Sequence, residues 1–212
     1  MIDKIKGAIF DVDGTILDSM GKWASLGNDY LRSVGGEPRE DLGKVFKTFT
    51  TEEAARYYIE NYGVSLSEEE IVRGINAMIE DFYKQEVCLK PGAGEFLAGL
   101  KAEGVKMCLA TASDRELVEA ALKRLGVWDY FDGMLTCSEL GAGKENPLIF
   151  RKAHEVLGTP AEETWVFEDA YHALRTAAEA GFRTAAVYDP SEPLQEEIRN
   201  LADYYIDNYE AE

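Results

Sequence analysis

The stretch GAIFDVDGTILDS, Gly7–Ser19, decides how this 212-residue chain folds. Its apolar run, residues 8–10, is typical of a buried strand, and Asp11, Asp13 and a Gly-Thr turn follow directly. Because side chains alternate along an extended chain, the two aspartates should point to the same side. Two carboxylates about 4 Å apart repel each other by about 4 kcal/mol if the effective dielectric constant is about 20. The stretch therefore indicates a strand that ends in a functional site.

Similar short apolar runs recur along the chain and alternate with helical patterns. The runs cover residues 105–111, 132–137, 164–169, 183–188 and, weakly, 203–208. The helical patterns between them cover residues 92–104, 115–126, 147–158 and 171–181. Strands that alternate with helices of about 10–15 residues predict βαβ units and a parallel sheet.

One block breaks this alternation, because residues 17–87 carry helical patterns and no convincing strand. Such a block cannot contribute to a parallel sheet, so we interpret it as a helical cap inserted after the first strand. The predicted fold is α/β: a Rossmann-like three-layer core with a parallel sheet, residues 1–16 and 88–212, plus an inserted all-helical cap domain, residues 17–87.

Composition excludes several classes of protein. The net charge of −18 and the pI near 4.5 oppose binding to nucleic acids or anionic membranes. Three cysteines without paired spacing do not form a disulfide or zinc framework. No run approaches the ~18 apolar residues of a membrane span, and the N-terminus lacks the apolar region of a signal peptide. We therefore expect a cytoplasmic protein with no nucleic-acid or membrane partner.

The polar residues that follow the predicted strands should meet, because ligands of parallel sheets bind beyond the carboxyl ends of the strands. These residues are Asp11, Asp13, Gly14, Thr15, Thr111, Ala112, Ser113, Lys144, Glu168 and Asp169.

Taken singly, these residues have plain structural explanations. Thr111 could cap a strand end, Ser113 could be the N-cap of the helix that opens near Arg115, and Lys144 could be a surface lysine. Together they indicate a site, because four acids at one edge repel unless a cation lies between them, and Lys144 alone cannot offset four carboxylates. Mg2+ fits best, since it prefers carboxylate oxygens and the oxygens of a substrate phosphate.

Paired aspartates beside Mg2+ also suit a definite chemistry. One can act as nucleophile and the other as general acid and base. A carboxylate that attacks a phosphate is repelled by it, so Mg2+ and Lys144 must neutralise that charge. Gly14 allows a tight turn that brings backbone N–H groups to the phosphate.

The motifs DVDGT (11–15), LATAS (109–113), GK (143–144) and FEDA (167–170), in this order, resemble the signature motifs of the haloacid dehalogenase-like hydrolases. The helical insertion resembles the cap of the phosphoglycolate phosphatase and β-phosphoglucomutase branch. This resemblance implies that Asp11 is the nucleophile and forms an aspartyl-phosphate. It further implies that Asp13 is the general acid and base.

The resemblance also implies the binding roles. Thr111 and the Ala112 N–H would hold the transferred phosphoryl group, and Lys144 would bridge it to Asp11. Gly14, Thr15 and Ser113 would complete the phosphate-binding loops. Mg2+ would be held by Asp11, the backbone carbonyl of Asp13, Asp169 and, directly or in support, Glu168.

Three positions depart from the family pattern. After Lys144, Glu145 stands for the usual proline and Leu148 for an aspartate, which leaves the orientation of the lysine open. Ala170 has lost a hydroxyl that often supports the acidic loop, and Ala173 stands where glycine is usual. None of these changes removes a group that performs chemistry.

The resemblance favours a phosphatase that hydrolyses a small phosphorylated metabolite, as a monomer or homodimer. A β-phosphoglucomutase-like mutase is the alternative. Against it, Trp23 occupies the position of a histidine in that enzyme, and Lys47 is a weak match for its cap arginine. Residues expected to face the substrate, unless they only build the cap interior, are Trp23, Phe46, Lys47, Thr48 and Phe49. A receiver domain would be shorter and would lack the cap, and a non-catalytic binder would be expected to have lost Asp11 or Asp13.

Overall fold

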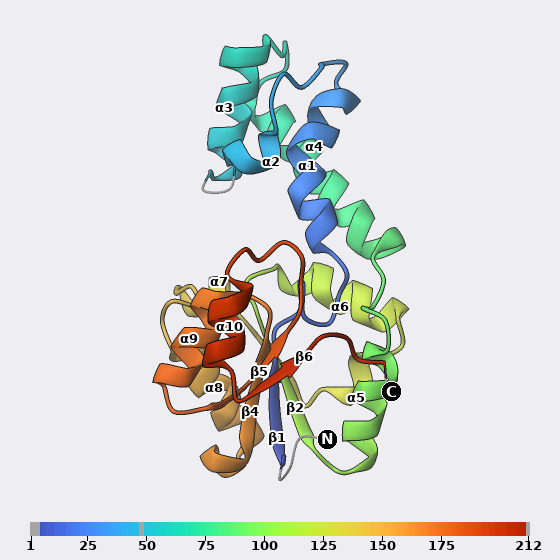
Figure 1. The fold of residues 1–212 in the computed structure, drawn as a ribbon. Helices are drawn as coiled ribbons and strands as arrows, with labels where there is room; N and C mark the ends of the chain where they lie inside the picture. Colours follow the sequence, from blue (N-terminus) through green and yellow to red (C-terminus); the bar gives the residue numbers. More distant parts are fainter. Residues whose placement is uncertain (1–4, 47–48, 211–212) are drawn as a thin grey trace. The chain divides into compact units, whose positions relative to one another are not determined.

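The computed structural model describes residues 5–46 and 49–210 (Figure 1). Contacts within the chain divide it into two compact units. The larger unit joins Met1–Asp18 to Val87–Glu212, and the smaller unit is Ser19–Glu86.

The larger unit is built on a parallel sheet of six strands in the order β3-β2-β1-β4-β5-β6. The strands are β1 (Gly7–Phe10), β2 (Lys106–Thr111), β3 (Gly133–Thr136), β4 (Thr164–Glu168), β5 (Arg183–Val187) and β6 (Tyr204–Ile206). The predicted parallel α/β sheet is thus confirmed, including the weak run at residues 203–208. Strand β1, which carries the opening stretch, lies between β2 and β4.

Helices cover both faces of this sheet (Figure 1). They are α5 (Ala93–Ala102), α6 (Arg115–Arg124), α7 (Cys137–Leu140), α8 (Leu148–Leu157), α9 (Tyr171–Glu179) and α10 (Gln195–Leu201), with 3-10 turns η3 (Trp128–Tyr130) and η4 (Ala161–Glu163).

The alternation of side chains along β1 explains the two helical layers. Ile9 lies in one hydrophobic cluster with residues of α8 and α9. Phe10 points to the other face, where its ring stacks on Phe167 at 4.3 Å and meets Phe96 of α5 edge-on at 6.4 Å. Ile9 and Phe10 are fully buried, and such burial contributes about 1.5–3 kcal/mol per side chain. This packing fixes β1, and with it the residues that follow.

The smaller unit consists of helices joined by loops, with no strand among its described residues. It consists of α1 (Met20–Ser33), α2 (Leu42–Val45), α3 (Thr51–Tyr62), α4 (Glu68–Asp81) and the π-helix η2 (Phe82–Glu86). Capping boxes, Thr50 with Glu53 and Ser67 with Glu70, start α3 and α4. The fully buried Tyr58 of α3 donates its hydroxyl to the carbonyl of Gly27 in α1 at 2.7 Å. The smaller unit, called the cap below, therefore has a hydrophobic core of its own.

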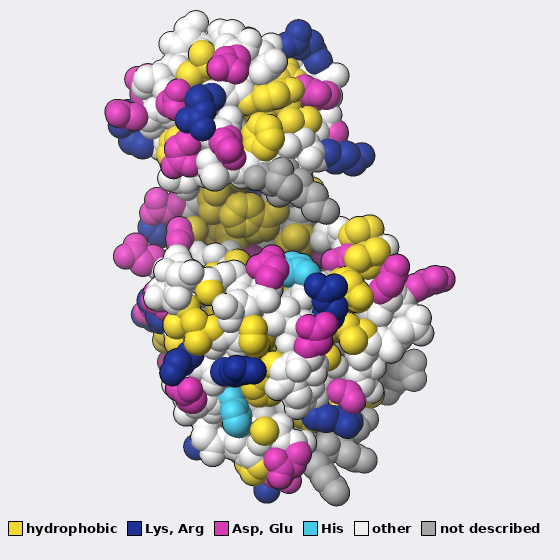
Figure 2. All heavy atoms as spheres, turned by 90° about the vertical axis from the view of Figure 1, so that its left-hand side faces the viewer, with side chains coloured by type: hydrophobic (Ala, Val, Ile, Leu, Met, Phe, Trp, Pro, Cys, Tyr) yellow, Lys and Arg dark blue, Asp and Glu magenta, His cyan; other side chains and the backbone are white. Residues whose placement is uncertain are grey.

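Among the helices of residues 5–46 and 49–210, none combines the length and apolar character that a membrane crossing requires. On the face drawn in Figure 2, basic side chains are interspersed with acidic ones rather than gathered into a patch.

Candidate active site

The site lies at the carboxyl ends of the central strands. Asp11 follows β1 directly, and its N–H donates to the carbonyl of Phe167 at 3.0 Å, which extends the pairing of β1 with β4. Thr111 ends β2 on one side of β1, and Glu168 ends β4 on the other. Strands β2 and β3 lie on one side of β1 and strands β4, β5 and β6 on the other, so the strand order reverses beside β1. Ligands of parallel sheets bind at such a reversal, beyond the carboxyl ends of the strands.

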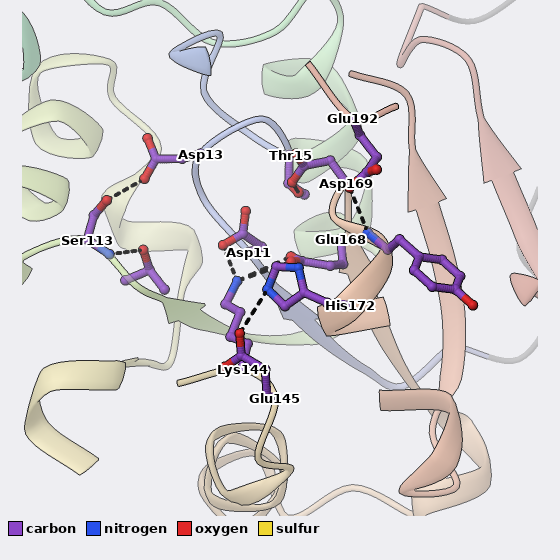
Figure 3. Close-up of polar contacts among 12 residues, drawn as sticks. Asp11, Asp13, Thr15, Ser113, Lys144, Glu145, Glu168, Asp169, His172 and Glu192 are labelled. Carbon is purple, nitrogen blue, oxygen red and sulfur yellow. Dashed lines mark hydrogen bonds and ion pairs between the residues drawn. The ribbon is translucent and has the colours of Figure 1, made fainter. Parts of the chain in front are cut away.

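A buried cluster of three acids forms at this edge of the sheet (Figure 3). Carboxylate oxygens of Asp11, Glu168 and Asp169 lie within 4.8 Å of one another. Lys144 is only 6% exposed, and its ammonium contacts the carboxylate of Asp11 and lies 3.2 Å from Oε2 of Glu168. The lysine is therefore part of the site and not a surface residue.

Burial and the mutual repulsion of the carboxylates raise the pKa of each acid in the cluster. Burial, opposed by Lys144 and reinforced by neighbouring carboxylates, raises the pKa of Asp11 above its ordinary value and that of Glu168 well above it. Burial and then Asp11 raise the pKa of Asp169 to about 8. Burial alone would lower the pKa of Lys144, but Asp11 and Glu168 raise it overall.

The donor set fits a divalent cation. When its three carboxylates are ionised, the cluster carries three negative charges against the one positive charge of Lys144, which leaves two uncompensated. Mg2+ supplies that charge and prefers carboxylate oxygens. Asp11, Glu168 and Asp169 could therefore hold it.

Thr15 supports this cluster through its hydroxyl. Its hydroxyl donates to Oδ1 of Asp169 at 2.9 Å, and both groups are buried. The hydroxyl of buried Tyr209 donates in turn to the carbonyl of Thr15 at 3.1 Å. Sequence reasoning missed Tyr209, because no local motif links residues 194 positions apart.

The side chain of Asp13 is not part of the acid cluster. It turns to Ser113, whose hydroxyl donates to Oδ2 of Asp13 at 2.6 Å (Figure 3). The expectation that Ser113 is the N-cap of α6 is wrong: the N-cap is Asp114, because the hydroxyl of Ser113 is held by Asp13. Thr111 accepts the N–H of Ser113 at 3.0 Å and so shapes this loop, while Ala112 is exposed.

Gly14 has the turn role that the sequence predicts, with φ of 84° in the left-handed region. Its N–H, however, donates to the carbonyl of Leu17 at 3.0 Å. This hydrogen bond closes the turn, and the expectation that the turn brings backbone N–H groups to a phosphate stays a prediction.

The departures after Lys144 leave the lysine directed at Asp11. Asn146 accepts the N–H of Leu148 at 3.0 Å with its side-chain oxygen and so helps to start α8. Glu145 is exposed, and its carboxylate lies 3.8 Å from Nε2 of His172.

The structure places three of the five residues expected to face the substrate, and their role toward a substrate stays a prediction. The indole N–H of Trp23 donates to the hydroxyl of Tyr83 at 3.3 Å, so at least this polar atom serves the interior of the smaller unit. Phe46 packs edge-on against Tyr58 at 5.1 Å. Phe49 is 38% exposed. Lys47 and Thr48 lie outside the described residues.

This fold and this site define an α/β enzyme with a buried carboxylate–lysine centre at its strand ends. The chain belongs to the haloacid dehalogenase-like hydrolases, because the sequence model of that family matches residues 8–187. The predicted family is thus confirmed.

Individual relatives agree with this placement. Over 220 residues the chain is 28% identical to the protein CbbY of Rhodobacter capsulatus, covering 98% of this chain and 95% of that protein. Over 177 residues it is 25% identical to the phosphorylated carbohydrates phosphatase of Thermotoga maritima, covering 84% of this chain and 82% of that one. The crystal structure of CbbY from Rhodobacter sphaeroides with phosphate has the same fold, with a TM-score of 0.75, 24% identity and coverage of 97% and 95%.

Proposed function

We propose that the protein is a Mg2+-dependent phosphatase that hydrolyses a small phosphomonoester through an aspartyl-phosphate on Asp11. The observation that carries this proposal is the contact of buried Lys144 with Asp11 inside the acid cluster. A carboxylate placed between an ammonium and a cation-binding pair of acids is suited to attack a phosphoryl group. The relatives include a phosphatase of phosphorylated carbohydrates, which supports the same substrate class.

The reaction proceeds in two steps, formation and then hydrolysis of the aspartyl-phosphate. The carboxylate of Asp11 attacks phosphorus, the bond to the leaving oxygen breaks, and Asp13 gives that oxygen its proton. Asp13 then removes a proton from a water molecule, which attacks phosphorus and releases inorganic phosphate together with the free Asp11 carboxylate. Ser113 holds Asp13 through the 2.6 Å hydrogen bond, and Lys144 compensates the charge of the transferred group.

In this proposal Asp11, Asp169 and the carbonyl of Asp13 hold Mg2+, with Glu168 as ligand or support. When bound, the cation neutralises phosphoryl oxygens that would otherwise repel the acids.

The test is phosphate release from a panel of small phosphomonoesters, with Mg2+ and with chelator, for the parent and for Asp11→Asn and Asp13→Asn. The panel holds phosphoglycolate, sugar phosphates, nucleoside monophosphates and pyridoxal phosphate. Turnover that needs Mg2+ and is lost in both variants supports the proposal. Conversion of β-glucose 1-phosphate without phosphate release would instead establish the mutase alternative, and equal turnover in Asp11→Asn would refute the nucleophile.

A further inference from the structure

The acidic loop is the segment 168–170, between the end of β4 and the start of α9 at Tyr171. The first turn of α9 therefore helps to set the direction in which Glu168 and Asp169 leave the sheet. Its N-cap residue, Ala170, has an extended backbone with φ of −88° and ψ of 128° but no side chain that can accept a hydrogen bond. Helices usually carry Ser, Thr, Asp or Asn at this position, because the first N–H groups have no partner within the helix. An acceptor must therefore come from elsewhere.

Glu192, in the loop after β5, provides an acceptor. Its Oε2 accepts the N–H of Tyr171, the first residue of α9, at 3.1 Å (Figure 3). Its Oε1 accepts the N–H of Leu194 at 2.8 Å, so the carboxylate is held by both oxygens. A negative charge at this end of a helix is also favoured by the helix dipole.

The loop that carries Glu192 is itself anchored. Asp189 is 2% exposed and forms an ion pair with Lys90 at 2.9 Å. The ammonium of Lys90 also donates to the carbonyl of Tyr188 at 2.6 Å. The N–H of Glu192 donates to the carbonyl of Asp189 at 3.2 Å. The ion pair of Lys90 with the buried Asp189 thus helps to set the position from which Glu192 reaches α9.

We infer that Glu192 is a positioning residue that holds the acidic loop in its cation-binding geometry by capping α9 in place of Ala170. It acts through the N–H of Tyr171, two residues after Asp169. The inference rests on the proposed function and deepens it. It names Glu192, which lies outside the sequence motifs, as a residue on which Mg2+ binding depends.

The experiment compares Glu192→Ala, Glu192→Gln and the double variant Glu192→Ala/Ala170→Ser. Glu196→Ala is the matched control, since Glu196 is an exposed acid four residues further on. Binding of Mg2+ alone is read from the Mg2+ dependence of thermal unfolding, and kcat and KM are read separately with the best phosphomonoester. Because the binding measurement needs no turnover, a failure of the proposed phosphatase activity is distinguished from a failure of this inference.

In Glu192→Ala the Mg2+ concentration at half-saturation should rise about 10-fold, as for other residues that orient metal ligands. The kcat should fall at saturating substrate with little change in KM. Glu192→Gln keeps an acceptor and should shift half-saturation less, and Ala170→Ser should restore most of the loss by providing a local cap. Half-saturation in Glu192→Ala equal to that of Glu196→Ala overturns the inference. If the single variant does not fold, a folded double variant with parental half-saturation supports the inference, and one with a raised value overturns it.

Discussion

The ammonium of Lys144 forms an ion pair with the carboxylate of Asp11, a residue 133 positions earlier in the chain. The same ammonium lies 3.2 Å from Oε2 of Glu168, so the positive charge of Lys144 is shared by two of the buried acids. This arrangement explains how a buried strand can end in carboxylates. Lys144 compensates part of their negative charge, and a bound metal ion would compensate the rest.

Lys144→Met should reduce kcat by about 100- to 1,000-fold, because it removes a fixed positive charge beside the group that gains charge in the transition state. Steady-state kinetics with the best phosphomonoester measure this loss. Lys152→Met is the control, since Lys152 is a half-exposed lysine of α8 paired with Glu155. A Lys144→Met variant as active as the control would contradict the role of the lysine.

Stabilisation by Mg2+ should increase from about pH 5 to about pH 8. The raised pKa values of Asp11, Glu168 and Asp169, about 8 for the last, mean that the folded metal-free protein keeps protons that the unfolded chain releases near about pH 4. The free energy of unfolding without metal therefore falls as pH rises through this window. Mg2+ replaces those protons, so its effect on the thermal midpoint should be larger at high pH. An equal or larger effect at about pH 5 would show that the acids do not bind the cation.

Ser113→Ala should lower kcat about 10-fold and leave the thermal midpoint nearly unchanged. It removes the 2.6 Å hydrogen bond that orients Asp13, whose proton transfers the mechanism requires. Ser33→Ala, which removes a hydroxyl bonded to the carbonyl of Tyr30 in the cap, is the control for loss of a serine. Parental kcat in Ser113→Ala would mean that Asp13 needs no such support.

Tyr58→Phe should lower the free energy of unfolding by about 1 kcal/mol, because it removes a buried hydrogen bond to Gly27. Its neighbour Tyr57 offers a matched comparison, since its hydroxyl donates to Glu40 at an exposed position. Tyr57→Phe should change stability by less than about 0.5 kcal/mol. Denaturant unfolding of both variants measures the difference, and equal losses would contradict a stabilising role of the hydrogen bond from Tyr58 to Gly27.

Much of the fold could be predicted because its signals are local. The apolar run before Asp11, the alternation of strands and helices, and the helical block after Leu17 can be read from neighbouring residues. The convergence of Asp11, Lys144 and Glu168 also follows, since parallel strands end at one edge of the sheet.

The finer geometry of the site could not be predicted, because it depends on contacts between distant side chains. The turn of Asp13 toward Ser113 spans 100 positions, and Tyr209 reaches Thr15 across 194. The sequence reveals the missing cap at Ala170, but only the fold shows that Glu192 supplies an acceptor. Gly14 signals a turn in the sequence, but only the fold shows that its own N–H donates to the carbonyl of Leu17.

The central claim is that Asp11 carries the phosphoryl group. It is tested most directly by quenching the enzyme in acid during turnover with Mg2+ and locating phosphate on its peptides by mass spectrometry. The account predicts a hydroxylamine-sensitive phosphoryl group on the peptide that contains Asp11, absent with chelator and absent in Asp11→Asn. Phosphate release by an Asp11→Asn variant at the parental rate, or a phosphoryl group on another residue, would contradict it.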